Sequence, residues 1–322
     1  MHWMRRHRSC LAVQAGGCRA LAVFLDARRV SIADLEARKK MVTVNGGIGA
    51  LVAAMQQMPL HAEVQEQGCR ALASLAKKSD ENQTAISDGN GVEAIVSALS
   101  HPAHRANASL HKHGCRALRN LAAKHSSNKG LIALHGGVKC LVASMQAHKR
   151  NAGVQEEASR ALANLAAANA ANQTAIAREN GMRALVDGMG LHLSNARVQV
   201  AGCLALGNLA CQDENKVLIT DAGGIEALVG SMRSHRSNAE VQEEGCWALL
   251  NTGWDGPRGS RRARALIAAG GVAVVCKAMR APNATARTVE WAQLLLRRLA
   301  PLADADKRQP ERKRLPVPGP RT

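Results

Sequence analysis

A sequence segment that is repeated six times along the chain constrains the fold more than any other feature. Six copies begin at Ala12, Glu63, Ser109, Gly153, Arg197 and Glu240. They align on one small residue: Cys18, Cys69, Cys115, Ser159, Cys203 and Cys246, spaced 51, 46, 44, 44 and 43 residues apart. A period of this length indicates a solenoid, in which each unit buries its apolar face only against its neighbours.

Each unit contains three segments with helical patterns. A short polar segment is followed by a glycine junction, a middle segment and the long repeated segment. In one middle segment, apolar residues fall at i, i+3, i+4 and i+7, which is one helical face: Val138, Leu141, Val142 and Met145. Asparagines precede four of the long segments and suit helix N-caps: Asn151, Asn195, Asn238 and Asn283. We therefore expect an all-α chain.

Three helices in a unit of about 43 residues resemble the armadillo repeats of β-catenin and importin-α. The resemblance extends to the armadillo regions of leucine-rich-repeat kinases. It implies a right-handed α-solenoid with about six units and a partial N-terminal one. We expect a basic N-terminal segment over 1–11, the repeat domain over 12–299, and a disordered Pro- and Arg-rich tail over 300–322. A degenerate last copy aligns Trp291 with Cys246 and puts Ala292 after it.

The resemblance also implies a concave groove lined by the third helices. Two positions of each third helix face this groove: a large residue, often Trp, and an Asn four residues later. The second position is filled here by Asn120, Asn164, Asn208 and Asn251, with Ser74 in an earlier copy. The first is filled by Arg70, Arg116, Arg160 and Trp247. An Asn amide donates and accepts, so this row could hold a peptide backbone.

Two alternatives stay open for these side chains. The asparagines could instead bond adjacent helices and serve only the fold. Glu66–Arg70 and Glu156–Arg160 are spaced as i, i+4 ion pairs on a helix surface. Arg116 lacks such an acid, as do its neighbours Lys112 and Arg119, and this basic group would favour an acidic ligand.

The formal net charge of +18 is unevenly distributed. Lys and Arg exceed Asp and Glu by 6 over residues 1–40, by 2 over 41–250 and by 10 over 251–322. A nucleic-acid-binding solenoid should carry its charge on the folded face, so this function is the alternative rather than the leading hypothesis. A regulatory fragment of a larger protein is a further alternative. The leading hypothesis is a scaffold or adaptor that binds an extended segment of a partner protein in the concave groove, and the basic group at Lys112, Arg116 and Arg119 leaves an acidic segment open.

The sequence lacks the motifs typical of enzymes, cofactor-binding proteins and metal-binding proteins. The sequence contains no phosphate-binding loop, zinc-protease helix or nucleophile elbow, so we expect no enzyme, no cofactor and no metal. No apolar run is long enough for a membrane helix. Five of the nine cysteines recur at one position of the repeat, which favours buried thiols in a reducing, cytoplasmic compartment. A basic run, Glu311 to Arg314, leaves a nuclear location open.

Overall fold

The computed structural model describes residues 1–26, 31–253 and 261–308, with the backbone alone given from 301 onward. All regular secondary structure in these ranges is helical. The first half contains α1 His2–Arg6, α2 Leu11–Phe24, α3 Ile32–Val44, α4 Gly47–Gln57, α5 Ala62–Ala76, α6 Asp80–Asp88, α7 Gly91–Ser100, the 3-10 turn η2 Pro102–His104, α8 Ala108–Ala122, α9 Ser126–Leu134 and α10 Gly137–Ala147. The second half contains α11 Ala152–Ala166, α12 Ala170–Arg178, α13 Gly181–Leu191, α14 Ala196–Leu209, α15 Asp213–Asp221, α16 Gly224–Ser234, α17 Ala239–Thr252, α18 Arg261–Ala268, α19 Gly271–Met279 and α20 Ala286–Arg308.

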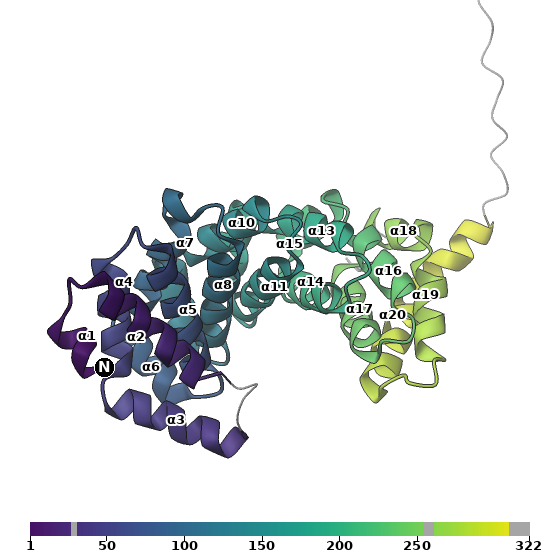
Figure 1. Ribbon diagram of the computed structural model, residues 1–322. Coiled ribbons are helices and arrows are strands. Elements are labelled where there is room, and N and C mark those ends of the chain that lie inside the picture. The colour runs from purple at the N-terminus through teal and green to yellow at the C-terminus, as the bar shows by residue number, and fades with distance from the viewer. Residues whose placement is uncertain (27–30, 254–260, 309–322) are drawn as a thin grey trace, which may run out of the picture.

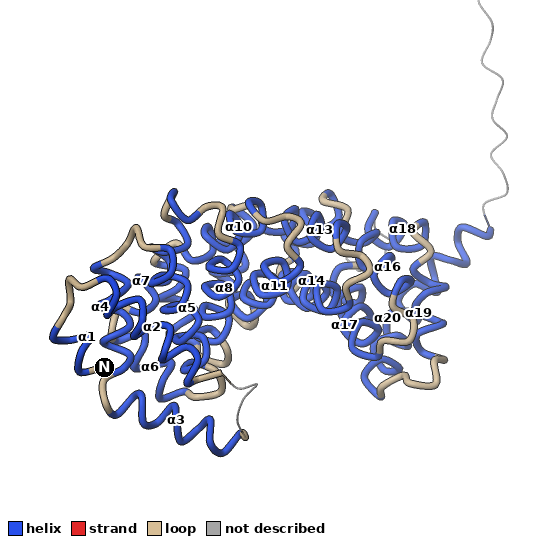
Figure 2. The backbone as a smooth tube through the Cα atoms, in the orientation of Figure 1, coloured by secondary structure: helices blue, strands red, loops and turns tan. Residues whose placement is uncertain are grey.

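The helices form an elongated arc of stacked units (Figures 1 and 2). After α1 and α2, the described helices group in threes, from α3–α5 to α18–α20. The third helix of each unit packs on the third helices before and after it, giving the row α2, α5, α8, α11, α14, α17 and α20. The predicted all-α solenoid of three-helix repeats is confirmed.

A left-handed backbone residue separates the first and second helices of every unit. Gly136 and Gly223 have φ angles of 79° and 83°, and Asn90 and Asn180 replace glycine at 61° and 58°. Glycine and asparagine adopt this conformation at low cost. The residue that follows starts the second helix, where Gly137 lies so close to Ile132 that a Cβ atom would come within 2.4 Å of its Cγ2. The junction therefore fixes a sharp turn with close packing.

The predicted N-caps are confirmed in three of four cases. Asn151, Asn195 and Asn238 each accept a hydrogen bond from a backbone N–H in the first turn of the third helix. The prediction for Asn283 is wrong, because Thr285 accepts the bond from the N–H of Thr288 instead. Asn283 donates to the carbonyl of Ser237 in the preceding unit at 2.7 Å.

A buried glutamine on most third helices caps the second helix of the same unit. The Nε2 of Gln155 donates to the carbonyl oxygens of Met145 and His148, at 2.8 and 3.2 Å. Carbonyls at a helix C-terminus have no partner within the helix, so this amide satisfies two of them. The same bonds, to residues ten and seven earlier, are made by Gln14, Gln65, Gln199 and Gln242.

Histidines near the second helices connect successive units. The Nε2–H of His104 donates to the Pro59 carbonyl oxygen at 2.7 Å, and the Nε2–H of His235 donates to the Leu193 carbonyl oxygen at 2.7 Å. A carbonyl can only accept, so each ring must donate. These bonds span 45 and 42 residues and therefore tie neighbouring loops together.

The C-terminal end differs from the expected boundary, whereas the N-terminal segment contains a helix of its own. The 1–11 segment contains α1, whose Met4 is buried against α2. Helix α20 continues to Arg308, past the expected start of the tail at 300, and residues 309–322 lie outside the described residues. The register expected for the last copy is wrong: Ala292 is fully buried, whereas Trp291 is half-buried beside Trp247. No helix among the described residues is both long and apolar enough to cross a membrane.

Candidate functional site: the row of third helices

A cavity of about 800 Å³ lies along the row of third helices between α5 and α14. Four residues expected at the groove line it: Arg70 and Ser74 from α5, and Arg116 and Asn120 from α8. The others do not line this cavity. They lie further along the same row, on α11, α14 and α17: Arg160, Asn164, Asn208, Trp247 and Asn251.

Each of the four asparagines expected at the groove, here called the ladder asparagines, forms a hydrogen bond with the third helix of the preceding unit. The Nδ2 of Asn120 donates to the Ala73 carbonyl at 2.7 Å. The same bond is repeated from Asn164 to Arg119 at 2.9 Å, from Asn208 to Ala163 at 3.0 Å and from Asn251 to Gly207 at 3.3 Å. One amide N–H of each side chain is therefore used inside the solenoid.

The four asparagines differ in what remains for a ligand. Asn120 is 7% exposed, and its Oδ1 already accepts from the Nε and Nη2 of Arg119 at 3.1 and 3.0 Å. Asn164, Asn208 and Asn251 are half-buried, and their Oδ1 atoms accept no hydrogen bond from the described residues. These three amides keep one acceptor and one N–H, which is the pair a peptide backbone needs.

The arginines of α8 have an acidic partner that helical spacing did not reveal. Arg116 Nε lies 2.7 Å from Glu157 Oε1, and Arg119 Nη1 lies 2.6 Å from Glu157 Oε2. Neither arginine has an acid at i, i+4 on its own helix, as the sequence indicated, but Glu157 of the next unit pairs with both. Burial lowers the pKa of the Arg119 guanidinium, and the charge of Glu157 acts in the opposite direction.

The two expected i, i+4 pairs have different outcomes. Arg160 Nε lies 3.6 Å from Glu156 Oε1, a loose pair on α11. The pair expected between Glu66 and Arg70 is wrong: Arg70 Nη2 bonds Asp26 Oδ2 at 2.9 Å. Asp26 stands 44 residues before Arg70, so the pair crosses between units.

The lining of the cavity is basic. Six Lys and Arg side chains face three carboxylates there. The cations are Arg70, Lys77, Lys112, Arg116, Arg119 and Arg197, and the carboxylates are Asp26, Glu66 and Glu157. Because Asp26 and Glu157 are both engaged with arginines, the excess positive charge lies at Lys77, Lys112 and Arg197. This part of the row of third helices therefore carries a positive electrostatic potential.

The far end of the row has a different character. Trp247 and Trp291 lie with ring centroids 6.3 Å apart. Trp247 packs on Gly207 of the preceding third helix, where a Cβ atom would come within 2.3 Å of the indole. Burial, and then the charges of Glu243 and Glu240, raise the pKa of the Glu244 carboxyl to about 7.

Other site chemistry finds no support in the described residues. They contain no group of three or more His, Cys, Asp or Glu able to hold a metal ion. Burial raises the pKa of the Cys18, Cys115, Cys203 and Cys246 thiols to about 12. Thiols with such values are poor nucleophiles and act as small core residues.

Sequence reasoning missed the residues that act across units. Glu157 and Asp26 complete the basic cavity, and Gln155 and its equivalents cap the second helices. The glutamines carried a signal, because a Val-Gln pair recurs in five of the six copies. The acids carried none, since their partners depend on the offset between neighbouring third helices.

The fold defines an armadillo-repeat solenoid, and comparison with known proteins identifies the family. The family model described as LRRK2 ARM repeat matches residues 1–253, so the chain belongs to this armadillo repeat family. A search of curated proteins gave no match.

Solved structures resemble the chain over most of its length. A crystal structure of an engineered protein has 31% identity and a TM-score of 0.68, covering 80% of this chain and 97% of its own. A designed armadillo repeat protein in complex with the peptide (KR)4 has 20% identity and a TM-score of 0.64, covering 78% and 99%. At this identity the second structure shows the fold alone.

Proposed function

We propose that the chain is a protein-interaction scaffold whose concave face holds an extended, acidic segment of a partner protein. The observation that carries the proposal is the cavity of about 800 Å³ with its excess of Lys and Arg. An armadillo solenoid presents a long surface and no enclosed active site, which suits recognition of a linear segment.

The spacing of the row supports an extended ligand. Packed helices lie about 8–10 Å apart, and two residues of an extended chain span about 6.6–6.8 Å. Curvature shortens the inner face, so each unit would meet about two ligand residues. Asn164, Asn208 and Asn251 would pair with the ligand backbone through their remaining acceptor and N–H. The designed armadillo protein that carries a bound peptide supports this use of the fold.

The charge of the lining selects the side chains. Lys112 and Arg197 have no ion pair with any described residue, so acidic ligand side chains would meet them without displacing a partner. Arg116 shares Glu157 with Arg119 and would offer the remaining face of its guanidinium. An acidic segment would therefore bind near α5, α8 and α11.

Fluorescence anisotropy with labelled (Glu-Ala)5 and (Lys-Ala)5 peptides tests the proposal. We expect (Glu-Ala)5 to bind more tightly, and Lys112→Gln with Arg197→Gln to weaken it about tenfold, since two solvent-accessible charged contacts contribute about 0.7 kcal/mol each. The control is Arg178→Gln, an exposed arginine at the end of α12. Equal binding of both peptides, or equal affinity in the double variant, would contradict the proposal.

Single-stranded DNA of matched charge separates the nucleic-acid alternative. Binding to phosphates should fall steeply with salt because condensed counterions are released. We expect the peptide to bind more tightly than the DNA at physiological salt. A salt-labile preference for DNA would favour the alternative function.

A further inference from the structure

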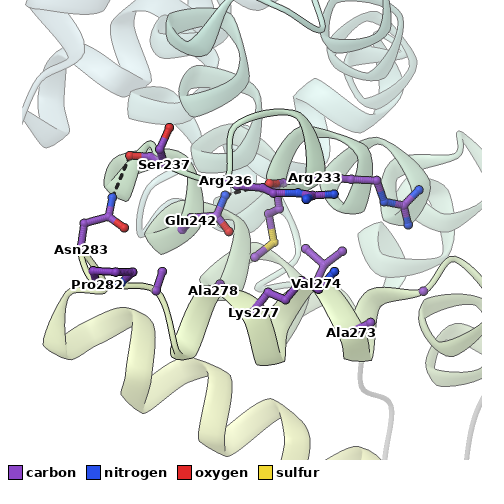
Figure 3. A pocket seen from close by; sticks show the side chains of 13 residues that line it. Arg233, Arg236, Ser237, Gln242, Ala273, Val274, Lys277, Ala278, Pro282 and Asn283 are labelled. Atoms are coloured by element: carbon purple, nitrogen blue, oxygen red, sulfur yellow. Dashed lines mark hydrogen bonds between the residues drawn. The ribbon is translucent and has the colours of Figure 1, made fainter.

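A second cavity lies away from the concave row, between α16 and α19. Its volume is about 520 Å³. Its floor is apolar and is formed by Met232 of α16 and by Val274 and Ala278 of α19, all buried. Figure 3 shows Arg233 and Arg236 on one side of this space and Lys277 with Val274 on the other. The size falls within the usual range for small-molecule sites, about 300–1,000 Å³.

The rim of this cavity is cationic throughout. Among the residues that the structure describes, the lining contains Arg233, Arg236 and Lys277 and no carboxylate. Arg233 is engaged, since its Nη2 donates to the Ala269 carbonyl at 3.0 Å. Arg236 and Lys277 are exposed, and neither forms an ion pair or hydrogen bond with another described residue. Two cations without partners therefore face an apolar floor.

The equivalent cavities in two other units lack this combination of an apolar floor and a cationic rim. Between α10 and α13 the cavity is about 280 Å³, and Arg183 and Asp187 form a 2.9 Å ion pair beside it. Arg183 and Ala273 both lie two residues after the glycine that begins their helix. Asp187 and Lys277 both lie six residues after that glycine. Replacement of the pair by alanine and lysine removes both the bulk and the acid.

The cavity between α4 and α7 is smaller still. It measures about 140 Å³ and has Glu93 at the position of Ala273. Glu93 is the one charged residue among the described residues that line this cavity. The three cavities share a methionine and a glutamine, so the repeat accounts for their position but not for the size and charge of the one at α19.

The second helix of the last unit, α19, is shorter than its equivalents. Helix α19 has nine residues, whereas α13 and α16 each have eleven. The chain then turns through Pro282 and Asn283, and the Asn283 side chain bonds the Ser237 carbonyl at 2.7 Å across one end of the cavity (Figure 3). The cavity is thus closed at one end and open at its cationic rim.

We infer that the cavity between α16 and α19 binds a small organic anion, with its apolar body on Met232, Val274 and Ala278 and its acid group between Arg236 and Lys277. A carboxylate or sulfonate would form charge-assisted bonds with a guanidinium and an ammonium that have no competing acid. The apolar part of the ligand would transfer from water to the buried apolar floor, which is favourable. The inference does not depend on the proposed function, because the concave cavity shares no residue with this one.

Titration with 8-anilinonaphthalene-1-sulfonate tests the inference, since this probe combines an aromatic body with a sulfonate and fluoresces in apolar sites. We expect one saturable site in the full chain. Arg236→Glu with Lys277→Glu should weaken it about tenfold or more, because two charge-assisted bonds become repulsive. Octanoate should displace the probe and 1-octanol at the same concentration should not.

A steric variant keeps the test independent of charge. Ala273 is exposed on the rim, so Ala273→Trp should fill the cavity without disturbing the core and should abolish saturable binding. The matched control is Ala143→Trp, at an exposed alanine of α10, which should bind the probe as the unmodified chain does. Absence of a saturable site, displacement by octanol equal to that by octanoate, or unchanged binding in either cavity variant would overturn the inference.

Discussion

The side chain of Asn164 donates from its Nδ2 to the backbone carbonyl of Arg119, at 2.9 Å, and so joins the third helices of two successive units. Asn120, Asn208 and Asn251 repeat this bond along the row. The ladder asparagines therefore have a structural role, whatever they also bind. Any test of the groove by alanine substitution has to separate the loss of this bond from the loss of ligand contacts.

Asn164→Ala should lower the free energy of unfolding by about 1 kcal/mol, because the Arg119 carbonyl loses a partner in a half-buried place. Urea denaturation followed by circular dichroism measures the change. Asn164→Asp keeps the shape and the acceptor but has no amide N–H, so it should be at least as destabilising. If both variants unfold at the same urea concentration as the unmodified chain, the bond does not contribute to stability.

Glu157→Gln should change stability and ligand binding in opposite directions. Glu157 is buried and contacts Arg116 at 2.7 Å and Arg119 at 2.6 Å, so its neutralisation should cost about 2 kcal/mol of unfolding free energy. It also releases two cations toward the groove, so (Glu-Ala)5 should bind more tightly. Urea denaturation and anisotropy measure the two effects.

The neighbouring Glu156 provides the control for that substitution. It meets Arg160 only at 3.6 Å and is more exposed than Glu157, so Glu156→Gln should change stability by less than about 0.5 kcal/mol. A weaker affinity for (Glu-Ala)5 in Glu157→Gln, with the fold intact, would contradict the proposed acidic ligand.

The sequence predicted the units because periodicity survives in every copy. The three helices, their glycine junctions and three of the four asparagine N-caps follow from local patterns. The last copy failed because its pattern is degenerate: the helix buries Ala292 and leaves Trp291 beside Trp247, one residue away from the expected register. A shift of one residue along a helix rotates the side-chain direction by about 100°.

The candidate site was only partly predictable. Helical spacing identified residues on the concave face, such as Arg116 and Asn120, which do line the cavity. It could not identify their partners. Glu157 lies 41 residues beyond Arg116, and Asp26 lies 44 residues before Arg70. Which residues meet across neighbouring third helices depends on the axial offset of the helices, and a repeat length does not contain that quantity.

Glu244 should make the C-terminal units less stable as pH rises. Burial, with Glu243 and Glu240 nearby, raises its pKa from 4.5 to about 7, while Arg287 and Arg160 act in the opposite direction. The folded state thus holds a proton that the unfolded state releases between pH 4.5 and 7, so stability falls across this window as pH increases.

Glu244→Gln should remove that dependence. We expect this variant to be more stable than the unmodified chain at pH 8, by about 1 kcal/mol after allowance for solvent screening of a partly exposed group. At pH 4.5 the two should be nearly equal. Thermal unfolding at a series of pH values measures the difference. A constant difference across the series would mean that Glu244 does not titrate between these limits.

His111 should have the opposite effect in the second unit. Burial, and then His148, lower its pKa from 6.5 to about 4. The folded state therefore keeps this ring neutral while the unfolded state takes up a proton below pH 6.5, so stability is lost as pH falls from 6.5 toward 4. His111 also occupies the position that glutamine holds in five other units, for instance Gln155.

His111→Gln should therefore stabilise the chain in acid. A glutamine amide there would reach the carbonyls ten and seven residues earlier, at His101 and His104, as its equivalents do. Glutamine does not take up a proton in acid, so burial carries no pH-dependent cost. The variant's advantage in unfolding free energy should therefore grow from near zero at pH 7.5 to about 1–2 kcal/mol at pH 4.5. Protonation of Glu244 stabilises the folded chain as pH falls over the same range. The comparison therefore requires His111→Gln, Glu244→Gln and the double variant. If His111→Gln does not alter the slope between pH 6.5 and 4.5 in either background, the buried ring is not the acid-sensitive group.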